Sequence, residues 1–176
     1  MEAVLVIDAQ RGIFEGSEPP DDGPGTLRRI NEVLARARAA GRPAIFLQHE
    51  EAPDLVRGAP GWELHPSLDR LPSDPVVRKA ECDGFRGTSL DEELGRWAAK
   101  TLVVMGCATE FCVDSTVRAA ASRGYHVVVV SDGHTTADRP PLAAAHIRAL
   151  HNWVWPRLAA TPPVTVMPAS AVHFGT

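Results

Sequence analysis

The chain reads LVVMGCATEFCVDST from residue 102 to residue 116, and its character changes in the middle of this stretch. An apolar, β-branched run ends at Gly106, and apolar residues at helical spacing begin at Val113. The pattern predicts a buried strand that turns directly into a helix. Cys112 lies at this turn.

A thiol at the start of a helix lies near unpaired backbone N–H groups and the positive end of the helix dipole. Both favour an anion, so we expect the pKa of Cys112 to lie below that of an ordinary thiol. The same amides can stabilise the oxygen that becomes negative when a carbonyl is attacked. The turn therefore has what a nucleophile and an oxyanion hole require. The alternative is a small apolar cysteine packed beneath a helix.

Two other predicted strands end in a charged residue. Residues 3–8 form an apolar run that ends at Asp8, and residues 76–79 form a short strand that ends at Lys79. The carboxyl ends of parallel strands meet at the edge of the sheet where ligands bind. Asp8, Lys79 and Cys112 are therefore expected at one edge. There the carboxylate can accept the thiol proton, and the ammonium can stabilise both anions.

The remaining strands and helices alternate along the chain. Strands are predicted at residues 44–49, 125–130 and 164–167, the second of them ending before Ser131-Asp132-Gly133. Helices are predicted between them, at residues 27–37, 90–97, 113–121 and 142–150. This order predicts an α/β fold, a three-layer α/β/α domain with a Rossmann-like, mainly parallel sheet of five to six strands. No GxGxxG follows the first strand, which argues against dinucleotide binding.

Composition narrows the class of protein. The length of 176 residues suits a single domain, residues 1–176. A net charge of −4 without a basic cluster argues against nucleic acid or an anionic membrane as partners. No apolar run has the ~18 residues of a membrane span, and no signal-peptide pattern is present, so we expect a cytoplasmic protein. Three cysteines without a CxxC pair fit neither a disulfide framework nor a structural zinc site.

Several motifs occur in a specific order along the chain. They are VIDAQ at residues 6–10, WELHP at 62–66, Lys79, GFRGTSL at 84–90, and GCATEFCV at 106–113 followed by Thr116 and Ala119. In this order and spacing they resemble the isochorismatase-like cysteine hydrolases, which include nicotinamidases, N-carbamoylsarcosine amidases and streptothricin hydrolases. The resemblance covers nearly the whole chain. It implies one isochorismatase-like hydrolase domain over residues 1–176.

The resemblance also implies roles for individual residues. Cys112 would attack an amide-type carbon of a small molecule to form a thioester, with Asp8 as general base and Lys79 as electrostatic partner. The family pattern places a cis peptide bond between Cys107 and Ala108. The amides of Ala108 and Cys112 would then form the oxyanion hole.

The chain departs from the family pattern at the metal motif. Nicotinamidases carry Asp-x-His after the second strand, whereas this chain has Leu47-Gln48-His49. We therefore expect no metal and no cofactor, although His49 and His65 could still coordinate a ligand. Family members that hydrolyse the vinyl ether of isochorismate lack the cysteine that Cys112 matches. Its presence argues against that reaction.

The substrate pocket is assigned from residues near the strand ends and from the loop at residues 50–75, whose length suits a binding site. An aromatic lining would suit a flat group, but no residue identifies the acyl group or the leaving amine. Cys82, Cys107 and the later histidines, among them His134, are placed outside the mechanism. The assigned pocket residues are Phe14, His49, Trp62, Phe85, Glu110 and Phe111.

Other functions and assemblies remain open. One alternative is a redox-reactive thiol protein in which Cys82 or Cys107 resolves an oxidised Cys112. Another is a non-catalytic α/β domain that binds a small molecule. The resemblance implies a homo-oligomer, a dimer or a tetramer, and Trp153 and Trp155 are candidates for packing against a partner.

Overall fold

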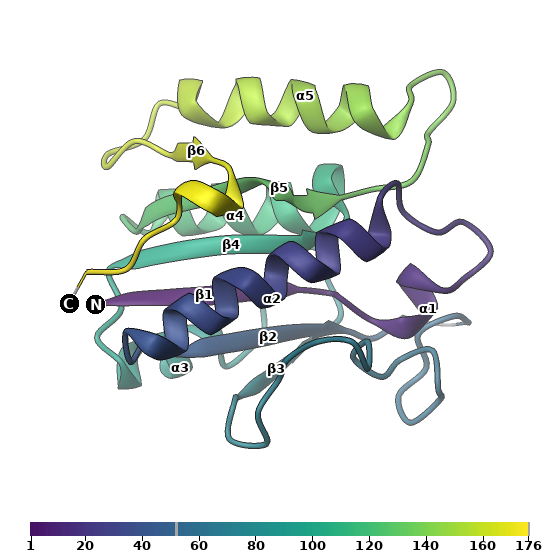
Figure 1. The fold of residues 1–176 in the computed structure, drawn as a ribbon, viewed down its shortest axis with the longest axis horizontal. Helices are drawn as coiled ribbons and strands as arrows, with labels where there is room; N and C mark the ends of the chain where they lie inside the picture. The colour runs from purple at the N-terminus through teal and green to yellow at the C-terminus, as the bar shows by residue number, and fades with distance from the viewer. Residues whose placement is uncertain (52, 176) are drawn as a thin grey trace.

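A single sheet runs through the centre of the molecule in the computed structural model, which describes residues 1–51 and 53–175 (Figure 1). Its neighbouring strands pair in parallel throughout, in the order β3-β2-β1-β4-β5-β6. The α/β fold with a parallel sheet of up to six strands is thereby confirmed. The strands are β1 (Glu2–Ile7), β2 (Ala44–His49), β3 (Val76–Lys79), β4 (Thr101–Cys107), β5 (His126–Thr135) and β6 (Thr165–Met167).

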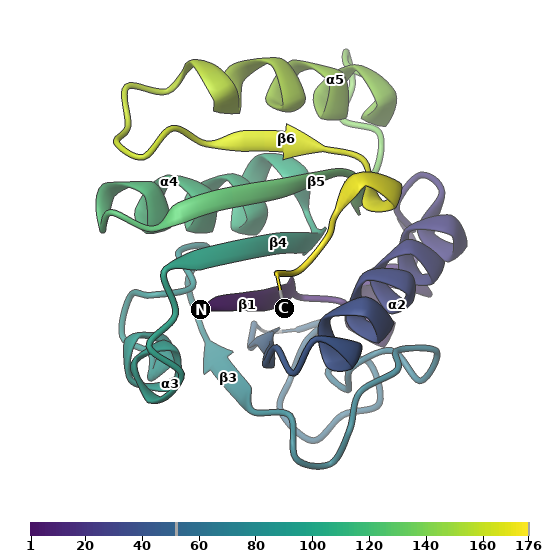
Figure 2. The ribbon, with the colours of Figure 1, turned by 60° about the vertical axis from the view of Figure 1, so that its left-hand side comes forward.

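Helices cover both faces of the sheet, which gives the predicted three layers (Figure 2). On one face α2 packs through an apolar stripe that includes Ile30 and Leu34. On the other face α3 and α4 pack through Leu90 and Val117. The helices are α1 (Arg11–Phe14), α2 (Gly23–Ala39), α3 (Leu90–Arg96), α4 (Asp114–Ser122) and α5 (Ala144–Val154), with short helical turns η1 (Thr109–Val113), η2 (Trp155–Arg157) and η3 (Ala169–Ala171).

The apolar run of β1 follows from burial on both faces. Val4 and Val6 face the α2 layer, whereas Leu5 and Ile7 face the α3 and α4 layer. Because side chains alternate between the faces of a strand, a strand covered on both faces must be apolar at every position. The polar Asp8 therefore marks the point where the strand leaves the core.

β5 is longer than predicted, because it continues to Thr135 instead of ending before Ser131. The pairing of β4 and β5 shifts register between Val104 and Gly106, and Gly106 pairs with His134. The intervening residues bulge out of the ladder. Gly133 permits this bulge, since a Cβ there would lie 2.8 Å from the side chain of Val130. The Ser-Asp-Gly sequence is thus a bulge within the strand, and the prediction of a strand end was wrong.

Gly106 is expected to tolerate no side chain. Its φ is +131°, and a Cβ would lie 2.0 Å from the carbonyl oxygen of Ile7. For Gly106→Ala, backbone strain and overpacking together predict a loss of about 3 kcal/mol or more in the free energy of unfolding. Urea denaturation measures this loss. Gly95→Ala is the matched control, because open space surrounds Gly95 in α3 and alanine favours a helix. Equal losses in both variants would contradict the steric argument.

The two tryptophans near the carboxyl terminus have different surroundings. Trp155 is fully buried, and its indole N–H donates a hydrogen bond to Asp114 at 2.8 Å. The suggestion that Trp155 contacts a partner was therefore wrong. Trp153 is 57% exposed and lies near the exposed Leu150 on α5. A homo-oligomer that uses this face stays a prediction.

No helix in the described part of the chain has the length and apolar character needed to cross a membrane.

Candidate active site

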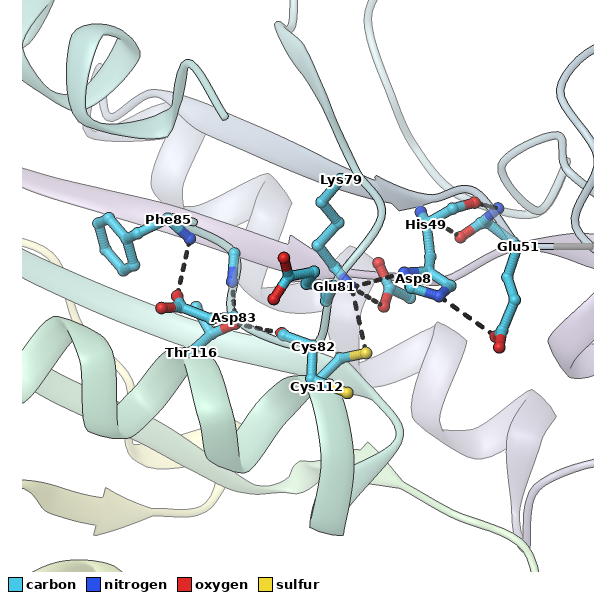
Figure 3. Close-up of polar contacts among 12 residues, drawn as sticks. Asp8, His49, Glu51, Lys79, Glu81, Cys82, Asp83, Phe85, Cys112 and Thr116 are labelled. Atoms are coloured by element: carbon cyan, nitrogen blue, oxygen red, sulfur yellow. Dashed lines mark hydrogen bonds and ion pairs between the residues drawn. The ribbon is translucent and has the colours of Figure 1, made fainter. Parts of the chain in front are cut away.

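Three side chains predicted from separate strand ends meet in one cluster (Figure 3). Asp8 follows β1, Lys79 ends β3, and Cys112 lies in η1, just after β4. The ammonium nitrogen of Lys79 lies 2.7 Å from Asp8 Oδ2 and 3.1 Å from Cys112 Sγ. The side chains of Lys79 and Asp8 are 0% and 1% exposed, so this ion pair is shielded from water.

The backbone at Asp8 is held in an unusual conformation. Its φ is +48°, in the left-handed region that non-glycine residues rarely occupy. Neighbouring Gln10 fixes the segment, because its side chain donates to the carbonyls of His49 and Trp62 and accepts from the His49 amide. Strain of this kind persists only where the surroundings enforce it. The glutamine of the VIDAQ motif thus joins the ends of β1 and β2 to the loop that contains Trp62.

Cys112 does not lie at a direct turn from strand to helix, as predicted, but within a separate helical turn that precedes α4. Residues 109–113 form a π-helical turn, and α4 begins only at Asp114. The amides of Phe111 and Val113 both donate to the carbonyl of Ala108. The peptide bond between Cys107 and Ala108 is cis.

Burial sets the proton affinities of the ion pair. It raises the pKa of the Asp8 carboxyl, and the Lys79 ammonium only partly offsets this. Burial alone would lower the pKa of Lys79, but the nearby Asp8 and Cys112 outweigh it, and the pKa is raised. Lys79 therefore keeps its charge, while Asp8 accepts a proton more readily than an exposed carboxylate does.

The surroundings of Cys112 favour its protonated thiol. Burial raises its pKa, the Asp8 carboxylate adds to this rise, and Lys79 opposes it. The expected lowering of the pKa is not found, because burial and the Asp8 carboxylate together outweigh the opposing effect of Lys79. A nucleophilic Cys112 must lose its proton to a base during the reaction, and Asp8 is the adjacent acceptor.

His49 extends the cluster on the side of β2. Its Nδ1 lies 3.2 Å from Lys79 Nζ, and its Nε2 lies 3.3 Å from a carboxylate oxygen of Glu51. Asp8, His49 and Cys112 have donor atoms within 4.8 Å of one another, a set of oxygen, nitrogen and sulfur that zinc accepts. The Lys79 ammonium, however, is within 3.2 Å of a donor atom of each of the three residues. The ammonium of Lys79 thus already pairs with all three groups that could hold a metal ion.

A cavity of about 400 Å³ opens over the cluster. Asp8, Cys112 and Ala108 lie along it. Apolar side chains form much of the remaining wall, and charged groups also line it. These lining residues are Ile13, Pro20, Leu55, Phe111, Ala137, Glu18, Glu51 and Arg139, together with His49, Cys82 and Cys107.

Of the six predicted pocket residues, His49 and Phe111 line this cavity. Phe14 lines a second cavity along α2, and Trp62 lines a third beside β3. Phe85 is buried in the core and stacks on Tyr125. Phe14, Trp62 and Phe85 thus lie close to the motifs in the sequence but do not line the cavity over the cluster.

Glu110, the remaining predicted pocket residue, points toward the segment after β5. It accepts hydrogen bonds from Thr136 at 2.9 Å and from Arg139 Nε at 3.0 Å. Arg139 also contacts Glu18 and lines the cavity, a role that the sequence did not suggest. The signal that could have found Arg139 is its position just after β5, a strand that ends at the same edge of the sheet as the cluster.

The chain is similar to known proteins in both sequence and structure. The isochorismatase domain model matches residues 2–160. A streptothricin hydrolase of Streptomyces noursei is 40% identical over 142 residues, which cover 80% of this chain and 56% of that protein. The chain thus spans little more than half the length of this relative.

Two further proteins are similar over more of their length. The ureidoacrylate amidohydrolase RutB of Methylorubrum extorquens is 30% identical, with 86% of this chain and 77% of that protein covered. A crystal structure of an isochorismatase family protein superposes with a TM-score of 0.87 at 35% identity, over 94% of this chain and 97% of that one. The chain therefore belongs to the isochorismatase domain family.

Proposed function

We propose that the protein is a cysteine-dependent hydrolase that cleaves an amide-type C–N bond of a small molecule. The observation that carries this proposal is the contact of one buried ammonium, Lys79, with both the Asp8 carboxylate and the Cys112 thiol. The names of two similar proteins, a streptothricin hydrolase and a ureidoacrylate amidohydrolase, support hydrolysis and an amide-type bond.

The first half of the reaction forms a thioester. Asp8 accepts the proton of Cys112 as the sulfur attacks the carbonyl carbon, and the carbonyl oxygen becomes negative. The amides of Ala108 and Cys112 are proposed to stabilise that oxygen. Asp8 then donates the proton to the leaving nitrogen as the C–N bond breaks. Lys79 stays charged and stabilises the carboxylate and the developing thiolate.

The second half releases the acid. Asp8, again a carboxylate, accepts a proton from water, whose oxygen attacks the thioester carbon. The C–S bond breaks, the proton returns to the sulfur of Cys112, and the acid leaves. Asp8 is suited to both proton transfers, because one of its oxygens binds Lys79 while the other has no hydrogen-bond partner among the described residues.

A redox-reactive thiol is less well supported. Thiolate, and not thiol, reacts with peroxide, so redox-sensing cysteines have lowered pKa values. The pKa of Cys112 is raised. The raised pKa instead suits a thiol that gives its proton to Asp8 as it attacks a substrate.

The proposal predicts turnover with a covalent intermediate. We expect a panel of small amides, ureas and lactams to contain a substrate from which the protein releases ammonia or an amine. Acid quenching during turnover, followed by peptide mass mapping, is expected to find the acyl mass on the peptide that contains Cys112. Release of amine with the acyl group on another residue would contradict the proposed nucleophile. Oxidant-dependent disulfide formation without amide turnover would favour the redox alternative.

A further inference from the structure

A buried histidine lies behind the turn that contains Cys112. The bulge in β5 places His134 opposite Gly106 in the sheet, and His134 has no exposed surface. Its Nδ1 lies 2.8 Å from the hydroxyl of Thr109, the first residue of the π-helical turn. Its Nε2 lies 3.0 Å from Oδ1 of Asn152 on α5.

The direction of each hydrogen bond follows from the chemistry of the partners. The amide nitrogen of Asn152 donates to the carbonyl of Ser131, so Oδ1 faces His134 and can only accept. His134 therefore donates from Nε2. In the neutral ring Nδ1 then has the free lone pair and accepts from the hydroxyl of Thr109. Every polar atom in this chain of contacts has a defined role.

The surroundings keep this ring neutral and fixed. Burial lowers the pKa of His134 to about 4, so the ring carries no charge near neutral pH. The ring packs against Trp155 in a T-shaped arrangement, with ring centroids 5.0 Å apart. A protonated ring would have no lone pair to accept the bond from Thr109.

Thr109 follows directly after Ala108, whose amide is proposed to be half of the oxyanion hole. The turn is also held through Glu110, which accepts hydrogen bonds from Thr136 and Arg139. Residues from the end of β5 and just beyond it thus hold two consecutive side chains of the turn. An oxyanion hole depends on amides fixed before the negative charge develops, so such contacts affect the rate directly.

We propose that His134 is a positioning residue, which orients the Ala108 side of the turn through its hydrogen bond from Thr109. This inference rests on the proposed cysteine hydrolysis. His134 itself touches neither the substrate nor the thiol. Its contribution is to hold Thr109, and with it the neighbouring amide, in the direction that the developing oxyanion requires.

Two pairs of variants separate this role from a general effect on stability. Thr109→Val removes the hydroxyl and keeps the shape, whereas Thr109→Ser keeps the hydroxyl. His134→Gln places its amide near the position of Nε2, whereas His134→Asn places an acceptor near the position of Nδ1. His146→Gln on the exposed face of α5 is the matched control. The Thr109 pair decides the outcome if a His134 variant does not fold.

Turnover and alkylation of Cys112 are then compared. Thr109→Val and His134→Gln are expected to lower kcat by roughly 10- to 100-fold with little change in KM, because a misplaced donor acts on the transition state. Alkylation of Cys112 by iodoacetamide develops no oxyanion, so its rate should stay at the wild-type value. Thr109→Ser and His134→Asn should retain most of the kcat.

Each other outcome has a distinct meaning. A wild-type kcat in Thr109→Val would overturn the positioning role. A parallel fall of kcat, alkylation rate and melting temperature would also overturn it, since the contact would then be only structural. Equal turnover in the wild type and Cys112→Ala would instead refute the cysteine hydrolysis on which the inference rests.

Discussion

Replacing Cys112 with alanine is expected to abolish turnover of any amide that the wild-type protein hydrolyses. Alanine cannot form the thioester. Water is a much weaker nucleophile than the sulfur of Cys112 and does not replace it. Loss of a covalent nucleophile predicts a fall in kcat of roughly 10⁴-fold or more. Amine release at matched protein concentration measures this fall, and acid quenching should find no acyl-enzyme.

Two comparisons make the result specific to the sulfur. Ser122→Ala removes one exposed polar atom at the far end of α4 and should keep the wild-type rate. Cys112→Ser keeps a nucleophilic atom but replaces the thiol with a far weaker acid, so its turnover should also fall below detection. Substantial turnover in Cys112→Ala would mean that another group, or water alone, attacks the substrate.

The sequence predicted the strands that place the site because burial leaves a strong pattern. β1, β2 and β4 are covered on both faces, so their residues form continuous apolar runs. Each run stops where the chain reaches the edge of the sheet. Asp8 and Cys112 could therefore be assigned to one edge from the sequence alone, and Lys79 joined them because its strand ends at the same edge.

The sequence could not predict features that depend on three-dimensional neighbours. The bulge that brings His134 to Gly106 depends on space around Gly133, which the local sequence Ser-Asp-Gly does not distinguish from a turn. The raised pKa of Cys112 depends on burial beside Asp8, a residue more than one hundred positions away in the chain. Phe85 illustrates the same limit, because an aromatic residue inside a motif suits a core as well as a pocket.

Replacing Asp8 with asparagine is expected to lower kcat by about 10³-fold, the usual size of a lost general base. Asparagine keeps the shape of the side chain, but it can neither accept the proton of Cys112 nor return it to the leaving nitrogen. The raised pKa of that thiol makes the loss severe, since little thiolate forms without a base. Steady-state amine release measures the change. Asp91→Asn, an exposed acid on α3, is the matched control and should keep the wild-type kcat.

The pH dependence of kcat/KM tests the identity of the base separately from the size of the fall in kcat. Asp8 acts as a carboxylate, and burial raises its pKa above the ordinary value of 3.8. The activity of the wild type should therefore fall as the pH drops through this raised pKa, where the carboxyl gains a proton. The residual activity of Asp8→Asn should lack this acidic fall, because asparagine does not titrate. If the variant keeps the same acidic fall, another group accepts the proton, and the raised pKa of Asp8 reflects burial alone.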